Sequence, residues 1–201
     1  MATQQNIGLL RLRMALWGLV VIVGIGATIL YLVRPPERPV GLFGGDFSLQ
    51  STKGGTFDQN DLKGAPSLIF FGYTFCPDVC PTTLVESTAW RQTLNLTPDE
   101  LRIVFVSVDP ERDTLDLLKE YLTAFDSEVI GLTGTLDEVE KAKKAFGIYS
   151  KKVDDASSTE YLVDHTASVF MIGDDGKFEG TISFGEAKET ALAKVRKLTG
   201  S

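Results

Sequence analysis

The chain has 201 residues, of which 43% are hydrophobic, and it carries a net charge of −7 with two cysteines and a single histidine. This length allows one globular domain with a sizeable core and a short additional segment. The acidic balance argues against a surface for nucleic acid phosphates, because such surfaces are rich in Lys and Arg. The charge identifies no partner, since acidic surfaces also keep domains soluble.

The first predicted element is a transmembrane helix over residues 14–33, which contain no charged side chain. At about 1.5 Å per residue, this run reaches across the roughly 30 Å hydrocarbon core of a bilayer. A cleaved signal peptide is the alternative, but its apolar part usually has only about 7–15 residues and ends in small residues. Here the run is longer and leads into Arg34-Pro35-Pro36, so we expect an uncleaved anchor.

The anchor defines the predicted organisation of the chain. We expect a short cytoplasmic segment (1–13), a single-pass transmembrane anchor (14–33), a linker (34–45) and a globular domain (46–201). Basic residues flank both ends of the anchor, so the positive-inside rule does not fix its orientation. Two nearby cysteines favour an oxidising compartment. With no transit-peptide features before the anchor, the predicted location is a bacterial inner membrane, with the soluble domain in the periplasm.

The globular domain is predicted to begin with a small hairpin and to continue as alternating strands and helices. Continuous apolar runs predict buried parallel strands, and amphipathic segments predict the helices between them. The expected elements in chain order are a hairpin (46–50, 56–58), a strand (68–73), a helix (82–94), a strand (103–108), a helix (114–125), a strand (129–132), a helix (136–146), a hairpin (166–172, 177–184) and a helix (186–198). Residues 151–160 are expected to form a mobile loop. This order predicts an α/β, thioredoxin-like fold.

The two cysteines, Cys76 and Cys80, follow the first predicted buried strand, where open α/β sheets place their ligands. Four positions apart, their sulfurs can meet on a turn or at the start of a helix, where they could form a disulfide or hold a metal. Pro81 suits the first position of a helix, which makes Cys80 the expected N-cap. The helix dipole then favours thiolates, which attack disulfides and bind metals. An inert disulfide is the alternative, although so small a loop contributes little stability.

The single histidine, His165, comes just before the second predicted hairpin. In a thioredoxin-like arrangement, the loop that enters this hairpin packs beside the cysteines, so two sulfurs and one imidazole could converge. A capping or half-buried structural histidine is the alternative. The two thiols and the imidazole would be only three strong metal ligands, whereas structural zinc normally takes four.

Three short segments resemble the signature segments of one family. They are Gly72 to Pro81 (GYTFCPDVCP), Val108 to Thr114 (VDPERDT) and Val163 to Thr166 (VDHT). In these segments the chain is similar to the Sco/SenC family, membrane-anchored proteins of thioredoxin fold that serve copper delivery to cytochrome c oxidase. The resemblance covers residues 45–198, and the predicted anchor matches the family layout.

The resemblance implies a site, a function and partners. Cys76, Cys80 and His165 would bind one copper ion per domain, Cu(I) or Cu(II), for delivery to the binuclear CuA site of cytochrome c oxidase subunit II. Another periplasmic copper chaperone could act as the donor. In the alternative, a thiol–disulfide oxidoreductase, the redox pair Cys76 and Cys80 keeps the copper-site cysteines of the oxidase reduced, and a dithiol suited to one task suits the other. A peroxiredoxin-like peroxidase would leave Cys80 and His165 unexplained.

Acidic residues near the motifs have supporting roles in this interpretation. Asp164 could orient the imidazole of His165, as metal-bound histidines usually require, or it could be an exposed loop residue. Asp109, Pro110 and Asp113 are expected to shape and cap the start of a helix near the site rather than to contact the metal.

Overall fold

The N-terminal part of the chain carries the predicted anchor. The computed structural model describes residues 13–26, 28, 45–154 and 161–201, and the chain divides into two units, residues 1–37 and 38–201. Residues 13–26 and 28 are helical and exposed. The rest of the predicted anchor, the segment 1–12 and almost all of the predicted linker lie outside the described residues. Within the described part of the chain, no helix combines the length and apolar character needed to cross a membrane.

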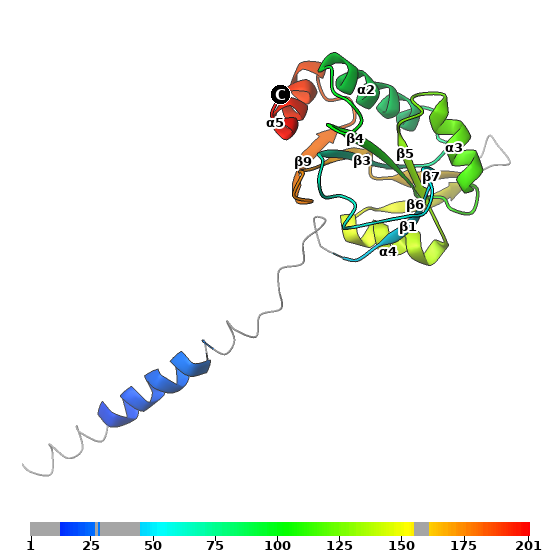
Figure 1. The fold of residues 1–201 in the computed structure, drawn as a ribbon. Helices are drawn as coiled ribbons and strands as arrows, with labels where there is room; N and C mark the ends of the chain where they lie inside the picture. Colours follow the sequence, from blue (N-terminus) through cyan, green and yellow to red (C-terminus); the bar gives the residue numbers. More distant parts are fainter. Residues whose placement is uncertain (1–12, 27, 29–44, 155–160) are drawn as a thin grey trace, which may run out of the picture. The chain divides into compact units, whose positions relative to one another are not determined.

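A mixed seven-stranded sheet organises the second unit (Figure 1). Its strands are β1 (Ser48–Ser51), β2 (Thr56–Asp58), β3 (Ser67–Gly72), β4 (Arg102–Ser107), β5 (Ile130–Thr133), β8 (Ser168–Ile172) and β9 (Phe178–Ser183), in the spatial order β2-β1-β5-β4-β3-β8-β9. Strands β3, β4 and β5 are parallel, whereas the β1–β2 and β8–β9 hairpins add antiparallel strands at the two edges. Both predicted hairpins and the α/β fold are therefore confirmed.

Helices cover both faces of this sheet. They are α2 (Val79–Thr93), α3 (Leu115–Thr123), α4 (Leu136–Phe146) and α5 (Lys188–Thr199). Figure 1 shows α2 and α4 on opposite sides of the sheet. Adjacent residues of a strand point to opposite faces: Phe71 packs on Phe146 of α4, with ring centroids 5.3 Å apart, while Gly72 faces Cys80 of α2. This double covering explains why every residue of β3 is buried.

A separate two-stranded sheet departs from the prediction. Strands β6 (Ser150–Asp154) and β7 (Tyr161–His165) pair antiparallel, with Ser150 opposite His165. The mobile loop predicted over 151–160 is therefore wrong for residues 151–154, while residues 155–160 lie outside the described part. The charged residues of this segment give no alternation of apolar and polar side chains, which is the pattern that identifies a strand in a sequence. The segment can still form a strand, because the backbone hydrogen bonds between strands require no apolar side chain.

Candidate metal centre

The cysteine loop, residues 73–80, leads from the carboxyl end of β3 into α2. Cys80 is fully buried, with 0% of its surface exposed, and packs against Gly72. A Cβ atom added at Gly72 would lie only 2.8 Å from Cys80 Sγ and 2.9 Å from the rings of Phe70 and Phe105. The missing side chain at Gly72 therefore lets the buried sulfur approach the strand.

Helix α2 begins earlier than the sequence predicts. Its N-cap is Asp78, so Cys80 is the second helical residue and Pro81 the third, and the predicted N-cap role of Cys80 is wrong. Proline is tolerated here because N–H groups in the first helical turn have no intrahelical acceptor. The first intrahelical hydrogen bond runs from the N–H of Thr82 to the carbonyl oxygen of Asp78, at 3.1 Å. Cys80 thus lies inside the first turn, still at the positive end of the helix dipole.

Cys76 lies in the loop just before α2 and is partly exposed. The backbone N–H of Cys80 donates to Cys76 Sγ at 3.3 Å. The neighbouring Cys80 thiol lowers the pKa of Cys76 well below its usual value, against the opposing effect of burial. Burial raises the pKa of Cys80, and the adjacent Cys76 raises it further. The two cysteines are not joined by a disulfide in the structure, and the pair consists of a partly exposed thiol with a lowered pKa beside a buried thiol with a raised pKa.

His165 reaches the cysteines from the end of β7. Its Nε2 atom lies 3.5 Å from Cys80 Sγ, and its Nδ1 atom lies 3.1 Å from the carbonyl oxygen of Thr166. A proton on Nδ1 that is donated to this carbonyl leaves Nε2 with a lone pair directed to the sulfurs. The rings of Phe70 and Tyr73 meet the imidazole edge-on, with centroids 5.9 and 5.8 Å away. The imidazole is thereby fixed in orientation.

One potential ligand atom from each of Cys76, Cys80 and His165 lies within 4.8 Å of the other two. The structure therefore brings together all three residues that the sequence singled out. Two sulfurs and an imidazole nitrogen form a soft donor set, which suits Cu(I) with low coordination; structural zinc normally takes four protein ligands. The residues present fit a copper ion.

The acidic residues near the motifs have other partners. Asp164 is exposed, and the Thr166 carbonyl takes the orienting position at His165 Nδ1 that Asp164 could have filled. Buried Asp113 accepts hydrogen bonds from Thr74 Oγ1 and from Ser107 Oγ, both at 2.6 Å. Its burial raises its pKa, against the effect of these hydrogen bonds. Asp113 thus ties the cysteine loop to the end of β4.

The cap of α3 also differs from the prediction. Thr114, not Asp113, is the N-cap, and its side chain accepts from the Leu117 N–H at 3.3 Å. Asp109 does shape the turn before the helix, because its carbonyl accepts from the N–H groups of Arg112 and Asp113 at 3.2 and 2.9 Å.

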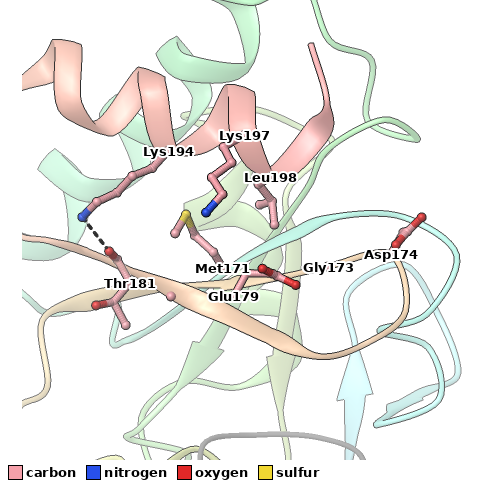
Figure 2. A pocket seen from close by; sticks show the side chains of 9 residues that line it. Met171, Gly173, Asp174, Glu179, Thr181, Lys194, Lys197 and Leu198 are labelled. Carbon is pink, nitrogen blue, oxygen red and sulfur yellow. Dashed lines mark hydrogen bonds between the residues drawn. The ribbon is translucent and has the colours of Figure 1, made fainter.

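A hollow lies away from these donors, between α5 and the β8–β9 hairpin (Figure 2). It has a volume of about 500 Å³, and Met171, Glu179 and Lys197 are among the residues that line it. Lys194 Nζ donates to the carbonyl oxygen of Thr181 at 2.9 Å on its wall. Its lining contains none of the three soft donors, so it is separate from the metal centre.

Comparison with known proteins agrees with this geometry. The family model described as SCO1/SenC matches residues 35–200. The chain belongs to the SCO1/SenC family. It is 37% identical over 169 residues to an SCO2-like protein of Rickettsia felis, covering 78% of this chain and 82% of that protein. It spans about half the length of the mitochondrial SCO2 of Saccharomyces cerevisiae and of the mitochondrial SCO1 homologue of Homo sapiens.

Solved structures of Sco proteins share the fold of this family member. Bradyrhizobium japonicum ScoI with copper bound matches with a TM-score of 0.70 and 38% identity, covering 79% of this chain and 99% of that chain. Yeast Sco1 with copper bound matches with a TM-score of 0.71 and 34% identity, covering 79% of this chain and 89% of that chain. The predicted thioredoxin-like Sco fold and the predicted family are confirmed.

Proposed function

We propose that this chain is a copper metallochaperone, which binds one copper ion through Cys76, Cys80 and His165 and delivers it to the CuA site of cytochrome c oxidase subunit II. The observation that carries the proposal is the convergence of these three donors within 4.8 Å. Two further facts support it: solved relatives hold copper, and the Sco family is associated with cytochrome c oxidase assembly.

The exposure of the three donors supports a role in transfer. Cys80 is fully buried, whereas Cys76 and His165 are partly exposed. Incoming ligands of a partner can therefore approach the ion from the side of Cys76 and His165 while Cys80 holds it last. The cargo moves by exchange of one ligand at a time, so no bare copper ion is released.

The proposal includes a membrane location. Residues 14–33 would anchor the chain in a bacterial inner membrane, residues 1–13 would be cytoplasmic, and the linker 34–45 would place the domain 46–201 in the periplasm. The support is the uncharged twenty-residue stretch in the sequence, which is long enough for a bilayer. There the domain could receive copper from another periplasmic chaperone. Labelling of engineered cysteines at Ala2 and Ser201 with a membrane-impermeant maleimide tests this, in a chain whose Cys76 and Cys80 are replaced by serine so that neither native thiol reacts. Only the C-terminal position should react in intact spheroplasts.

The deciding experiment is a Cu(I) competition titration of the reduced full-length chain in detergent. We expect one tight equivalent in the parent and strongly weakened binding in Cys76→Ala and His165→Ala. Asp164→Asn is the matched control, because Asp164 is adjacent to His165 but exposed, and it should bind as the parent does. The oxidised chain should bind no Cu(I), since a disulfide sulfur is a poor ligand. Tight binding that is indifferent to His165 would contradict the three-donor site.

A thiol–disulfide oxidoreductase is the second candidate, favoured by the lowered pKa of Cys76. The Cys76 thiolate would attack a disulfide of the oxidase copper site, form a mixed disulfide and release one partner thiolate. Cys80 would then lose its proton and attack Cys76 Sγ, which forms the Cys76–Cys80 disulfide and releases the second partner thiol. The partner is reduced and this chain is oxidised by two electrons. Mixing the reduced chain with the oxidised CuA-domain peptide and counting thiols on each tests this reaction.

A further inference from the structure

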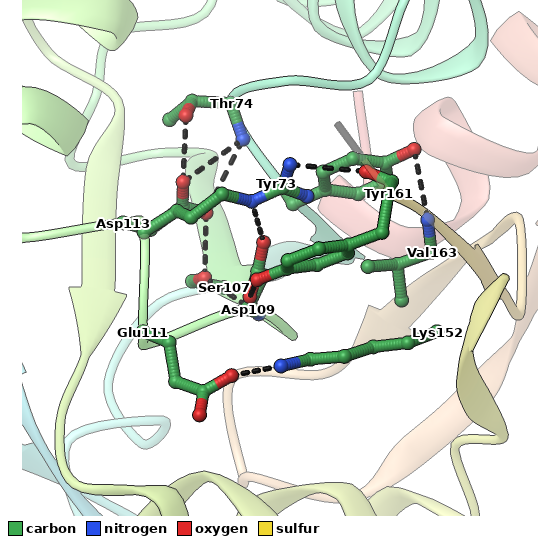
Figure 3. Close-up of polar contacts among 10 residues, drawn as sticks. Tyr73, Thr74, Ser107, Asp109, Glu111, Asp113, Lys152, Tyr161 and Val163 are labelled. Carbon is green, nitrogen blue, oxygen red and sulfur yellow. Dashed lines mark hydrogen bonds and ion pairs between the residues drawn. The ribbon is translucent and has the colours of Figure 1, made fainter. Parts of the chain in front are cut away.

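The β6–β7 hairpin lies outside the seven-stranded sheet, yet it carries one of the three donors. A two-stranded hairpin is only marginally stable by itself in water. Besides the contacts of its own ring with Phe70 and Tyr73, the position of His165 therefore depends on the side chains that fasten β7 to the rest of the domain. Figure 3 shows these contacts at the end of β4 and in the cysteine loop.

Arg112 and Tyr161 form the central contact of this fastening. The guanidinium carbon of Arg112 lies 3.7 Å from the centre of the Tyr161 ring, and Arg112 Nη1 donates to the Tyr161 carbonyl oxygen at 3.0 Å. Asp109 joins both residues: it accepts from Arg112 Nε at 2.5 Å and from the Tyr161 hydroxyl at 2.8 Å. Asp109 is 1% exposed and the Arg112 side chain is 13% exposed. The charges of Arg112 and Asp109 are thus largely removed from solvent, so water and salt screen their attraction less than that of a surface ion pair.

The same arginine also faces the cysteine loop. Its guanidinium carbon lies 4.7 Å from the centre of the Phe75 ring and 5.7 Å from that of Tyr73. Tyr73 in turn accepts a hydrogen bond at its hydroxyl from the Val163 N–H of β7, at 3.2 Å. Arg112 thus lies between the strand that carries His165 and the loop that carries Cys76.

Another contact of the hairpin is weaker. Lys152 of β6 pairs with Glu111, and both side chains are about half exposed, at 49% and 56%. Exposed ion pairs contribute little because water and salt screen them. The fastening therefore depends mainly on Arg112, whose side chain is 13% exposed, and on the partly buried Tyr161.

We propose that Arg112 and Tyr161 are positioning residues: their stacked contact holds β7 so that His165 meets the two cysteine sulfurs. Neither would contact the metal. This inference rests on the proposed copper-binding function and adds the residues that pre-organise its histidine ligand. Residues that orient metal ligands strongly influence affinity, because a misplaced ligand must be ordered at the moment of binding.

The test compares Cu(I) affinities of full-length variants by competition with bicinchoninate. Tyr161→Leu removes the ring and should weaken Cu(I) binding about tenfold, in the range typical of residues that orient a metal ligand without contacting the metal. Tyr161→Phe retains the ring over Arg112 and should stay within about twofold of the parent. Arg112→Lys keeps the charge but loses the planar stack and should resemble Tyr161→Leu. Arg102→Lys is the matched control and should bind as the parent does, because Arg102 likewise donates to main-chain carbonyls, those of Asp61 and Lys63, but contacts none of the three metal donors.

A double-mutant cycle separates positioning from general stability. In a His165→Ala background, Tyr161→Leu should cause no further loss of Cu(I) affinity, because the histidine on which it acts is gone. An equal loss with and without His165 would overturn the proposal, as would unchanged affinity in Tyr161→Leu. A parent that binds no Cu(I) would instead overturn the proposed function.

A measurement without copper completes the test. Nuclear Overhauser contacts between the His165 ring and the rings of Phe70 and Tyr73 should be present in the metal-free parent, given centroid distances of 5.9 and 5.8 Å. In Tyr161→Leu these contacts should weaken while those between Phe70 and Phe105 of the core persist. Loss of both sets would show that Tyr161→Leu is unfolded, and Arg112→Lys, which also removes the stacked contact, then takes its place in the test. Persistence of both sets in every variant would contradict the proposal.

Discussion

The two halves of the metal centre are built differently. Cys76 and Cys80 come from one loop and the start of α2, and Cys80 packs directly on the buried strand β3. His165 comes from a two-stranded hairpin outside the main sheet, and side-chain contacts hold it in place. A centre of this kind combines a rigid half, which fixes two sulfurs, with a half that is held by contacts between the β6–β7 hairpin and the rest of the domain. The predictions below separate these halves.

The largest effect is expected in the cysteine half. Cys80→Ala removes the fully buried sulfur ligand, and Cu(I) affinity should fall by more than about 100-fold, beyond the effect of residues that only orient ligands. The competition titration described above measures this loss. A control for simple damage to the core is Ala145→Gly, which removes a buried methyl group from α4, on the opposite side of the sheet. Its affinity should be unchanged even if its melting temperature falls.

The hairpin half should show a smaller loss. His165→Ala leaves both sulfurs in place, and Cu(I) affinity should fall by about 10- to 100-fold. Alkylation of Cys76 by iodoacetamide at pH 6 should continue, because the neighbouring Cys80 thiol is the main cause of its lowered pKa. The rate follows the thiolate fraction, so it should fall only when the pH drops through that lowered pKa. A Cys76 that becomes unreactive at pH 6 in this variant would mean that the two halves are not separable.

Packing of the rigid half can be tested at Gly72. Gly72→Ala places a methyl group 2.8 Å from Cys80 Sγ, and such overpacking typically costs about 1–3 kcal/mol of unfolding free energy. Gly45→Ala is the control, since its nearest contact would be an ordinary 3.4 Å. Chemical denaturation of both variants gives the comparison. An unaltered stability of Gly72→Ala would show that the sulfur is not confined by the strand.

The smallest effect is expected where the cysteine loop is tied to β4. Thr74→Val removes the hydroxyl that donates to Asp113 at 2.6 Å, and stability should fall by about 1–2 kcal/mol, as expected for a bond to a buried carboxyl group. Thr123→Val removes an exposed hydroxyl that donates to the Lys119 carbonyl at 2.8 Å and should change stability by less than about 0.5 kcal/mol. Equal effects at the two positions would argue against a special role of Asp113.

The sequence predicted the local parts of this molecule well. The apolar runs gave β3, β4 and β5, and α4 was predicted with the bounds that the structure has, Leu136–Phe146. Its start is encoded by a capping box between Thr135 and Glu138, which short-range hydrogen bonds alone can form. The start of α2 was missed because proline is favoured at the first helical position but is also tolerated later in the first turn, where Pro81 lies.

Prediction failed where distant residues decide the structure. β6 has no apolar period and is a strand only because β7 pairs with it. Arg112, Tyr73 and Tyr161 gave no chemical signal in the sequence, although the first two lie within the family motifs. Their roles depend on contacts across 49 and 90 residues of chain, Arg112 with Tyr161 and Tyr73 with Val163.

By itself, the sequence determined which atoms could bind a metal, because only two cysteines and one histidine offer soft donors, and it determined the family through three short motifs. Only the tertiary structure decided that these donors meet within 4.8 Å and that Thr166 rather than Asp164 orients the imidazole. The physical reason is that ligand chemistry belongs to single side chains, whereas distance and orientation depend on packing between segments that are far apart in the chain.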